Sequence, residues 1–429
     1  MQSLIDFFSF SDPNVRYVVF GNVLLSASAA MVGAFILLQK KALVGDAVSH
    51  AVLPGICAAF LFSGSKNTAF MLVGAFVTGW LALVAIDYIT AKSKIKKDAA
   101  IGLVLSVFFG AGMVMMTYIQ QSGNAAQSGL DHFIFGKAAT LVGEDLLIFS
   151  ALAATLLLVV GLFFKAFTLV AFDRPYAQAL GYPVRRLDLL LTSLTVLAVV
   201  TGITAVGVVL MAAMLITPAA AARYWTDNIR RMVGIAVAFG AFAGLAGAYI
   251  SYTAPSMPTG PWMVVVSSAI AFFSFFFAPK KGIIPKLYTQ RRNQRIIAEE
   301  NTLKIFYHLG ERTGNFNGMR NFNELIGARE VDGPLLEATL TRLVAKKLLR
   351  LQGDQWALTD TGWRKAIRVV RLHRLWELYL TNYMNIAADH VHDDAETIEH
   401  IITPELEREL ELQLGYPDKD PHDTEIPKI

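Results

Sequence analysis

Residues 45–55, Gly-Asp-Ala-Val-Ser-His-Ala-Val-Leu-Pro-Gly, place a carboxylate and an imidazole inside an otherwise apolar segment. The segment, residues 42–62, is long enough to cross a bilayer as a helix. An aspartate in such a segment costs roughly 2.5–3.5 kcal/mol on insertion scales, so its presence indicates a use. Asp46 and His50 are four residues apart and therefore lie on one face of a helix.

This pair admits two interpretations. A carboxylate and an imidazole suit borderline divalent metals such as manganese, iron or zinc, which makes Asp46 and His50 candidate metal ligands. Alternatively, Asp46 or Ser49 bonds to a neighbouring helix and His50 is neutral. The spacing alone is compatible with both.

The composition divides the 429-residue chain at about Pro279. A hydrophobic fraction of 54% and a mean hydropathy of +0.47 are those of a membrane protein averaged with a more polar region. Nine apolar spans are predicted, at residues 17–38, 43–62, 68–91, 99–119, 146–164, 188–206, 207–224, 231–253 and 260–278. The stretch 188–224 can also form one interrupted helix, because Gly202, Gly207 and Pro218 punctuate it, so the count is eight or nine.

Lysine and arginine are concentrated in alternate connections between these spans. One set holds sixteen of them and the other holds three, namely Arg16, Lys66 and Lys137. By the positive-inside rule, the richer set and everything after Pro279 lie in the cytoplasm. The richer set consists of Lys40, Lys41, Lys92, Lys94, Lys96, Lys97, Lys165, Arg174, Arg185, Arg186, Arg223, Arg230, Arg231, Lys280, Lys281 and Lys286. This topology places Asp46 near the cytoplasmic start of its span.

Residues 173–183, Asp-Arg-Pro-Tyr-Ala-Gln-Ala-Leu-Gly-Tyr-Pro, are predicted to form a short helix between two spans. Asp173 is a suitable N-cap and Pro175 fits the first turn, whereas Gly181 and Pro183 end the helix. Such a helix on the cytoplasmic face either docks into a groove of a partner or is a plain surface helix. The sequence has no Gly-x-x-x-x-Gly-Lys-Ser/Thr motif, so a pump built on this chain needs a separate ATPase subunit.

From about Ile296 the periodicity becomes that of a soluble domain. Helices are predicted around residues 303–309, 322–326 and 333–343, followed by strands at 348–351 and 355–358 about a turn at Gly353 and Asp354. This order is typical of a winged helix-turn-helix.

Potential metal ligands follow the winged helix at helical spacing. His373 and Glu377 are four residues apart. A second stripe consists of His392, Glu396, Glu399 and His400. These residues form either a metal site or a solvated polar face.

Several stretches of the membrane region, taken together, resemble the permease subunit of ABC importers for divalent metals, the zinc, manganese and iron family. They are residues 43–55, 102–106, 172–181, 215–220 and 258–260. The resemblance covers about residues 15–280. It implies that Asp46 and His50 line the translocation path and contact the ion. It also implies a coupling helix that sits on the ATPase, formed by Pro175, Tyr176, Ala177, Ala179, Leu180 and Gly181.

The same resemblance implies the setting of the protein. The chain would be a non-enzymatic transport subunit in the bacterial inner membrane, without a catalytic cofactor. Its cargo would be divalent manganese, iron or zinc. Its partners would be a cytoplasmic ABC ATPase dimer, an extracytoplasmic metal-binding protein and a second permease that is either a copy or a paralogue.

Residues 296–427 resemble the DNA-binding and metal-sensing domains of the diphtheria-toxin-repressor and manganese-repressor family. The matching stretches are residues 372–375, 392–400 and 420–422 ahead of 426–427. By that match His373, Glu377 and His392 would share one metal site, with Glu396, Glu399 and His400 contributing to a neighbouring one.

The tail also departs from that family. Asn301 and Lys304 stand where its manganese sensors supply acidic ligands, and a protonated lysine cannot bind a metal. Glu337 lies in the presumed recognition helix, where it would face phosphates, although Lys346, Lys347 and Arg350 follow it.

The sequence therefore predicts an α-helical integral membrane protein with eight or nine spans and a cytoplasmic winged-helix and metal-sensor-like tail. The expected divisions are a permease domain at 1–280, a basic linker at 281–298, a winged-helix domain at 299–370 and a helical dimerisation and sensor-like domain at 371–429. The tail is expected to regulate or stabilise a metal importer. Two alternatives stay open: a DNA-binding repressor, tethered or released by proteolysis between Tyr288 and Glu300, or a dimerisation domain with degraded ligands. DNA is the less favoured partner.

Overall fold

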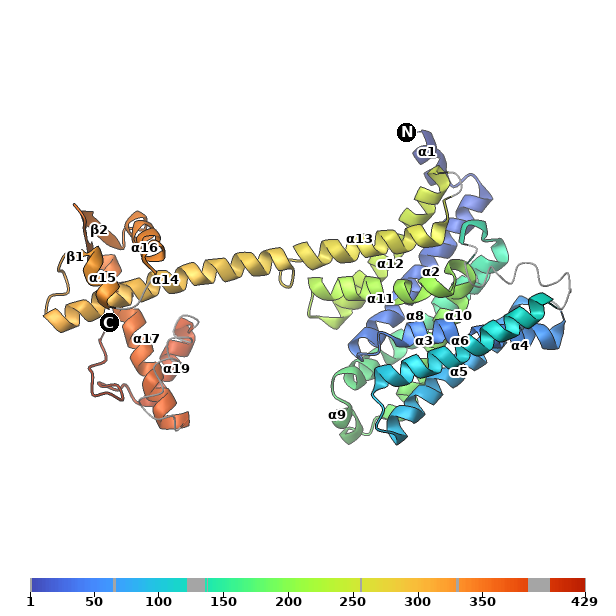
Figure 1. Ribbon diagram of the computed structural model, residues 1–429, viewed down its shortest axis with the longest axis horizontal. Coiled ribbons are helices and arrows are strands. Elements are labelled where there is room, and N and C mark those ends of the chain that lie inside the picture. Colours follow the sequence, from blue (N-terminus) through green and yellow to red (C-terminus); the bar gives the residue numbers. More distant parts are fainter. Residues whose placement is uncertain are drawn as a thin grey trace. The chain divides into compact units, whose positions relative to one another are not determined.

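The computed structural model describes residues 2–64, 67–121, 136, 138–254, 257–328, 332–384 and 402–428. Its contacts divide it into two compact units, Met1–Lys286 and Leu287–Ile429 (Figure 1). The finer divisions expected at residues 298 and 370 stay predictions, and a single helix runs across each of those positions.

The first unit is a helical bundle. Its helices in the described residues are α1 (Gln2–Ser9), α2 (Pro13–Leu38), α3 (Val44–Ala51), α4 (Leu53–Ser63), α5 (Thr68–Lys92), α6 (Lys97–Gln121), the short 3₁₀ helix η2 (Ala138–Thr140), α8 (Gly143–Phe172), α9 (Arg174–Ala179), α10 (Val184–Val206), α11 (Val208–Trp225), α12 (Ile229–Thr253) and α13 (Thr259–Phe277). Among the described residues, eight segments are long and apolar enough to cross a membrane, with α3 and α4 counted as one. The predicted membrane bundle is confirmed.

The stretch 188–224, which the sequence left open as one helix or two, forms two helices that break at Gly207. Gly207 has φ of 89°, a conformation that favours glycine. In a single continuous helix, Gly202 and Met211 would be about 13 Å apart along the axis. Instead they are in contact, because a Cβ on Gly202 would collide with the side chain of Met211. Helix α11 therefore folds back on α10. The indole of Trp225, the last residue of α11, donates to the hydroxyl of Ser274 in α13 at 2.9 Å. Helix α11 is not one of the eight segments counted above.

The span expected at 43–62 is not one regular helix. It divides into α3 and α4 at Val52, two residues before Pro54. A proline lacks the backbone N–H and crowds the preceding turn, so a break at this point has a direct cause. The break leaves Asp46 and His50 together on the short helix α3.

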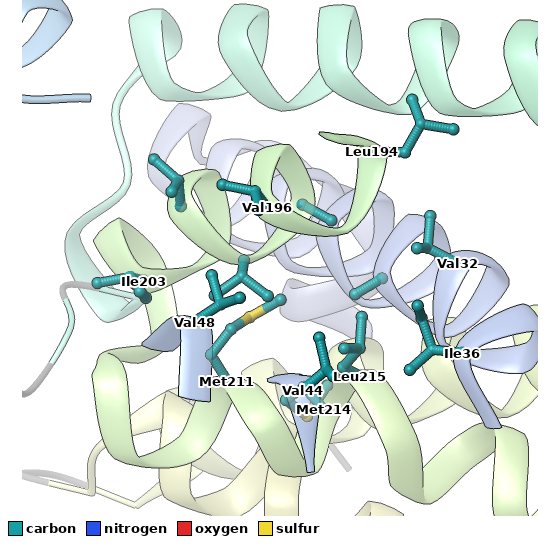
Figure 2. Close-up of a cluster of buried hydrophobic side chains, with 14 of the residues drawn as sticks. Val32, Ile36, Val44, Val48, Leu194, Val196, Ile203, Met211, Met214 and Leu215 are labelled. Atoms are coloured by element: carbon teal, nitrogen blue, oxygen red, sulfur yellow. The ribbon is translucent and has the colours of Figure 1, made fainter. Parts of the chain in front are cut away.

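Helix α3 is fixed by its apolar face. Figure 2 shows Val44 and Val48 of α3 packed among Val32, Ile36, Leu194, Val196, Ile203, Met211, Met214 and Leu215, which come from α2, α10 and α11. Glycines allow α2 and α3 to approach α11 closely. A Cβ on Gly33 of α2 would collide with the backbone of Leu215 in α11, and a Cβ on Gly45 of α3 would lie 2.9 Å from the side chain of Leu215. Because these contacts use one face of α3, Asp46 and His50 are on the other.

The second unit is a winged helix followed by a helical segment. Its elements in the described residues are α14 (Ile283–Thr313), β1 (Arg320–Asn321), α15 (Phe322–Ala328), α16 (Gly333–Ala345), β2 (Leu349–Gln352), β3 (Gln355–Leu358), α17 (Asp360–Met384) and α19 (Pro404–Leu414). The three strands are antiparallel in the order β1-β3-β2, with Leu349 opposite Leu358. The predicted winged helix is confirmed, and β1 is an additional strand that the sequence reading missed.

This unit has a core of its own. It includes Leu303, Phe306, Leu325, Leu340 and Leu358, all buried. The last helix is held to α17 by two ion pairs, Arg368 with Glu407 at 2.9 Å and Arg371 with Glu411 at 2.6 Å. These contacts fix α19 on α17.

Candidate functional site

The two predicted ligands on α3 lie side by side. Nε2 of His50 is 3.5 Å from Oδ1 of Asp46, and the side chains are 22% and 46% exposed. Two ligands about 2.1 Å from one tetrahedral ion are roughly 3.4 Å apart, so this spacing suits a shared divalent cation. The pair is therefore left uncovered by the described residues and arranged so that both ligand atoms can reach one ion.

The other nitrogen of His50 is buried. Nδ1 has no hydrogen-bond partner within the described part of the chain. The ring stands edge-on to Phe109 of α6, with 5.0 Å between ring centres and 83° between the planes. In the alternative interpretation Ser49 would bond to a neighbouring helix, but its hydroxyl donates to the carbonyl of Gly45 in the same helix at 2.9 Å.

Two protein ligands do not complete a coordination sphere. Within the described ranges no group of three or more histidine, cysteine, aspartate or glutamate side chains comes together. Transition metals bound by nitrogen and oxygen take at least four ligands. An ion at Asp46 and His50 would therefore need ligands beyond the histidine, cysteine, aspartate and glutamate side chains of the described residues.

The short helix predicted within residues 173–183 is present as α9, and its role as a coupling helix stays a prediction. Oδ1 of Asp173 accepts from the backbone N–H of Tyr176 at 2.9 Å, and Gly181 ends the helix with φ of 82°. Ala177 is buried, whereas Tyr176 and Leu180 are each 54% exposed. The predicted set of Pro175, Tyr176, Ala177, Ala179, Leu180 and Gly181 thus forms a capped turn with an outward apolar surface.

The tail holds a second histidine–carboxylate pair. In α17, Nε2 of His373 is 3.1 Å from Oε1 of Glu377, and both side chains are 4% exposed. Such a separation fits two ligands of one metal ion. The other predicted ligands, His392, Glu396, Glu399 and His400, lie outside the described residues.

Helix α14 holds two buried charged residues. Lys304, the departure noted above, is buried. Glu299 is buried as well, and its carboxylate binds Nζ of Lys346 at 2.6 Å and lies 3.5 Å from Nε of Arg342 in α16. Sequence reasoning missed Glu299, since nothing local pairs residues more than forty positions apart.

One more tail histidine was missed. His308 of α14 lies 3.4 Å from Glu311, whose carboxylate binds Arg374 of α17 at 2.8 Å. Burial, together with the nearby positive charge of Arg374, lowers the pKa of His308 to about 4. The spacing of three residues between His308 and Glu311 on a helix was the available signal.

Sequence comparison assigns both parts of the chain to known families. Residues 11–278 match the ABC 3 transport family. The chain belongs to the ABC 3 transport family. Residues 359–428 match the iron dependent repressor metal binding and dimerisation domain, so a permease and a repressor-family domain are joined in one chain. Both predicted resemblances are confirmed.

Two relatives and one solved structure are similar to this chain. The manganese transport system membrane protein MntC of Bacillus subtilis is 40% identical over 423 residues, which is 97% of each chain. The zinc transport system membrane protein TroC of Treponema pallidum is 41% identical over 283 residues, covering 66% of this chain and 95% of TroC. Among solved structures, PsaBC from Streptococcus pneumoniae in complex with Fab is 33% identical, covers 65% of this chain and 97% of its own, and has a TM-score of 0.58.

Proposed function

We propose that this chain is the membrane permease of an ATP-driven importer of a divalent transition metal, and that Asp46 and His50 pass the ion inward. The observation that carries the proposal is the open pair on α3, with two ligand atoms 3.5 Å apart on the face turned away from the core. The names of two relatives specify manganese and zinc as their transported metals. Asp and His also accept iron.

The incomplete coordination supports the expected partners. Asp46 is half exposed in the single chain, so a second permease, either a copy or a paralogue, could supply further ligands or close the path. The sequence has no phosphate-binding loop, and we assign ATP hydrolysis to a separate ATPase dimer docked on α9 in the cytoplasm. An extracytoplasmic metal-binding protein would deliver the ion from the other side.

The test is metal uptake by the reconstituted importer. We expect Asp46→Ala and His50→Ala to reduce uptake to background while assembly with the ATPase is retained. Asp98→Ala is a matched control, because Asp98 is an exposed carboxylate at the start of a neighbouring span. Normal uptake in either α3 variant would remove that residue from the ion path.

For the tail we propose regulation or stabilisation of the importer, with His373 and Glu377 as the first candidates for a regulatory metal. The surface of α16 supports this over the DNA-binding alternative. Its exposed side chains include Leu335, Glu337 and Ala338, which offer no cation to phosphates. Arg342 of α16 and Lys346, which follows the helix, form ion pairs with the buried Glu299.

A binding measurement separates the two roles. The full chain in detergent, with manganese and at a stated salt concentration, should bind duplex DNA no better than a metal-free sample does. Immunoblotting of cells should show one intact chain. A released tail fragment that binds DNA with metal-dependent affinity would instead establish the repressor alternative.

A further inference from the structure

A set of charged and polar side chains connects α9 to the base of α3. Arg174, the first residue of α9, donates from Nη2 to Oδ1 of Asp188 in α10 at 2.9 Å. The same oxygen lies 3.5 Å from Nε2 of Gln39, the residue that caps the end of α2. We propose that Asp188 is a positioning residue that transmits movement of α9 to α3, and so to Asp46 and His50; this rests on the proposed transport function.

Helix α9 is built to move as one body. Its start is fixed by the Asp173 cap, and its end is closed by hydrogen bonds from Gly181 to Gln178 at 2.9 Å and from Tyr182 to Ala177 at 3.0 Å. A partner that pushes on the exposed side chains of this helix therefore displaces its backbone as a unit. Arg174 is part of that unit, so its guanidinium shifts with it.

The connection from Asp188 to Asp46 and His50 is short. After Gln39, Lys40 adopts φ of 57°, the backbone N–H of Lys41 donates to Ile36 at 3.0 Å, and that of Val44 donates to Lys41 at 3.0 Å. The connection is thus hydrogen-bonded to α2 on one side and to α3 on the other. A shift of Gln39 is carried directly into the first turn of α3, which contains Asp46.

Asp188 also belongs to a larger group of charges at this end of the bundle. Lys97, at the start of α6, interacts electrostatically with Lys41, Asp87, Arg174 and Asp188. Three cations and two carboxylates from separate elements therefore share this end of the bundle. Loss of the Asp188 charge leaves the cations repelling one another, which changes the position of Arg174 relative to α10. Because the pair is partly exposed, its effect on overall stability is small.

Coupling is measured in proteoliposomes that contain the permease, its ATPase and the external metal-binding protein. The quantity is metal taken up per ATP hydrolysed, with manganese, zinc and iron supplied in turn. Asp188→Asn should keep assembly and basal ATPase activity but lower this ratio about fivefold or more, within the range of allosteric couplings. Arg174→Gln tests the same contact from α9 and should lower the ratio similarly.

Two further variants decide the interpretation. Arg185→Gln is the matched control and should leave the ratio unchanged, since Arg185 is an exposed residue in the first turn of α10 whose side chain makes no hydrogen bond or ion pair with the described residues. The charge exchange Arg174→Asp with Asp188→Arg should recover part of the loss. The proposal is overturned by an unchanged ratio in both single variants, by an equal loss in Arg185→Gln, or by an exchange that recovers nothing. A wild-type complex that imports none of the three metals would refute the transport function instead.

Discussion

Two histidine–carboxylate pairs share the same spacing of four residues but lie in different surroundings. In the membrane unit, Asp46 and His50 are 3.5 Å apart with side chains 46% and 22% exposed. In the tail, His373 and Glu377 are 3.1 Å apart and 4% exposed. The open pair suits an ion that must enter and leave. The closed pair suits an ion, or a contact, that is retained, so the two pairs differ in burial although they share one spacing.

The largest expected effects are a loss of uptake when the open pair is changed and a loss of stability when the closed pair is changed. Asp46→Ala should abolish uptake and leave the bundle intact, because the half-exposed carboxylate is not packed into the core of the bundle. Glu377→Ala should destabilise the tail by about 1–3 kcal/mol, because it removes the carboxylate bonded to a buried imidazole. Hydrogen exchange of α17 in the full chain measures the second effect, and uptake assays measure the first.

Glu377→Gln is the control for that comparison, since it keeps the shape and hydrogen-bonding capacity of the side chain. It should retain most of the protection of α17. The contrast between the pairs fails if Asp46→Ala loosens α3 as much as Glu377→Ala loosens α17.

A smaller difference is expected in metal retention. After dialysis of the purified chain against metal-free buffer, metal analysis should find the retained ion in the tail rather than on α3. His373→Ala should then lower the metal content, whereas His50→Ala should leave it unchanged. A loss confined to His50→Ala would reverse the assignment of the open and closed pairs.

Local patterns predicted much of this molecule. The apolar spans, the capped helix α9 and the winged helix follow from periodicity, caps and turn residues within a few positions of one another. The break at Val52 also has a local cause in Pro54, but the sequence reading treated the whole segment as one span. Both histidine–carboxylate pairs were found because four residues on a helix is a local spacing.

Contacts between distant residues were out of reach. Gln39 meets Asp188 across 149 positions, and Glu299 meets Lys346 across 47. Charge and spacing do not select one carboxylate among many, because the selection is made by tertiary packing. Exposure has the same origin, so the sequence could not show that one histidine pair is open and the other closed.

The smallest expected effect is a pH dependence confined to the tail. His308 faces Glu311 on its own helix and Arg374 on α17, with Lys304 one turn away. Its pKa falls from 6.5 to about 4 on folding, so the unfolded tail binds more protons between these values. The stability contributed by neutral His308 is therefore complete above pH 6.5 and is lost as the pH falls toward 4. Hydrogen exchange of α14 should accelerate over that window, and His308→Gln should flatten the dependence, whereas an unchanged slope in this variant would assign it to other groups.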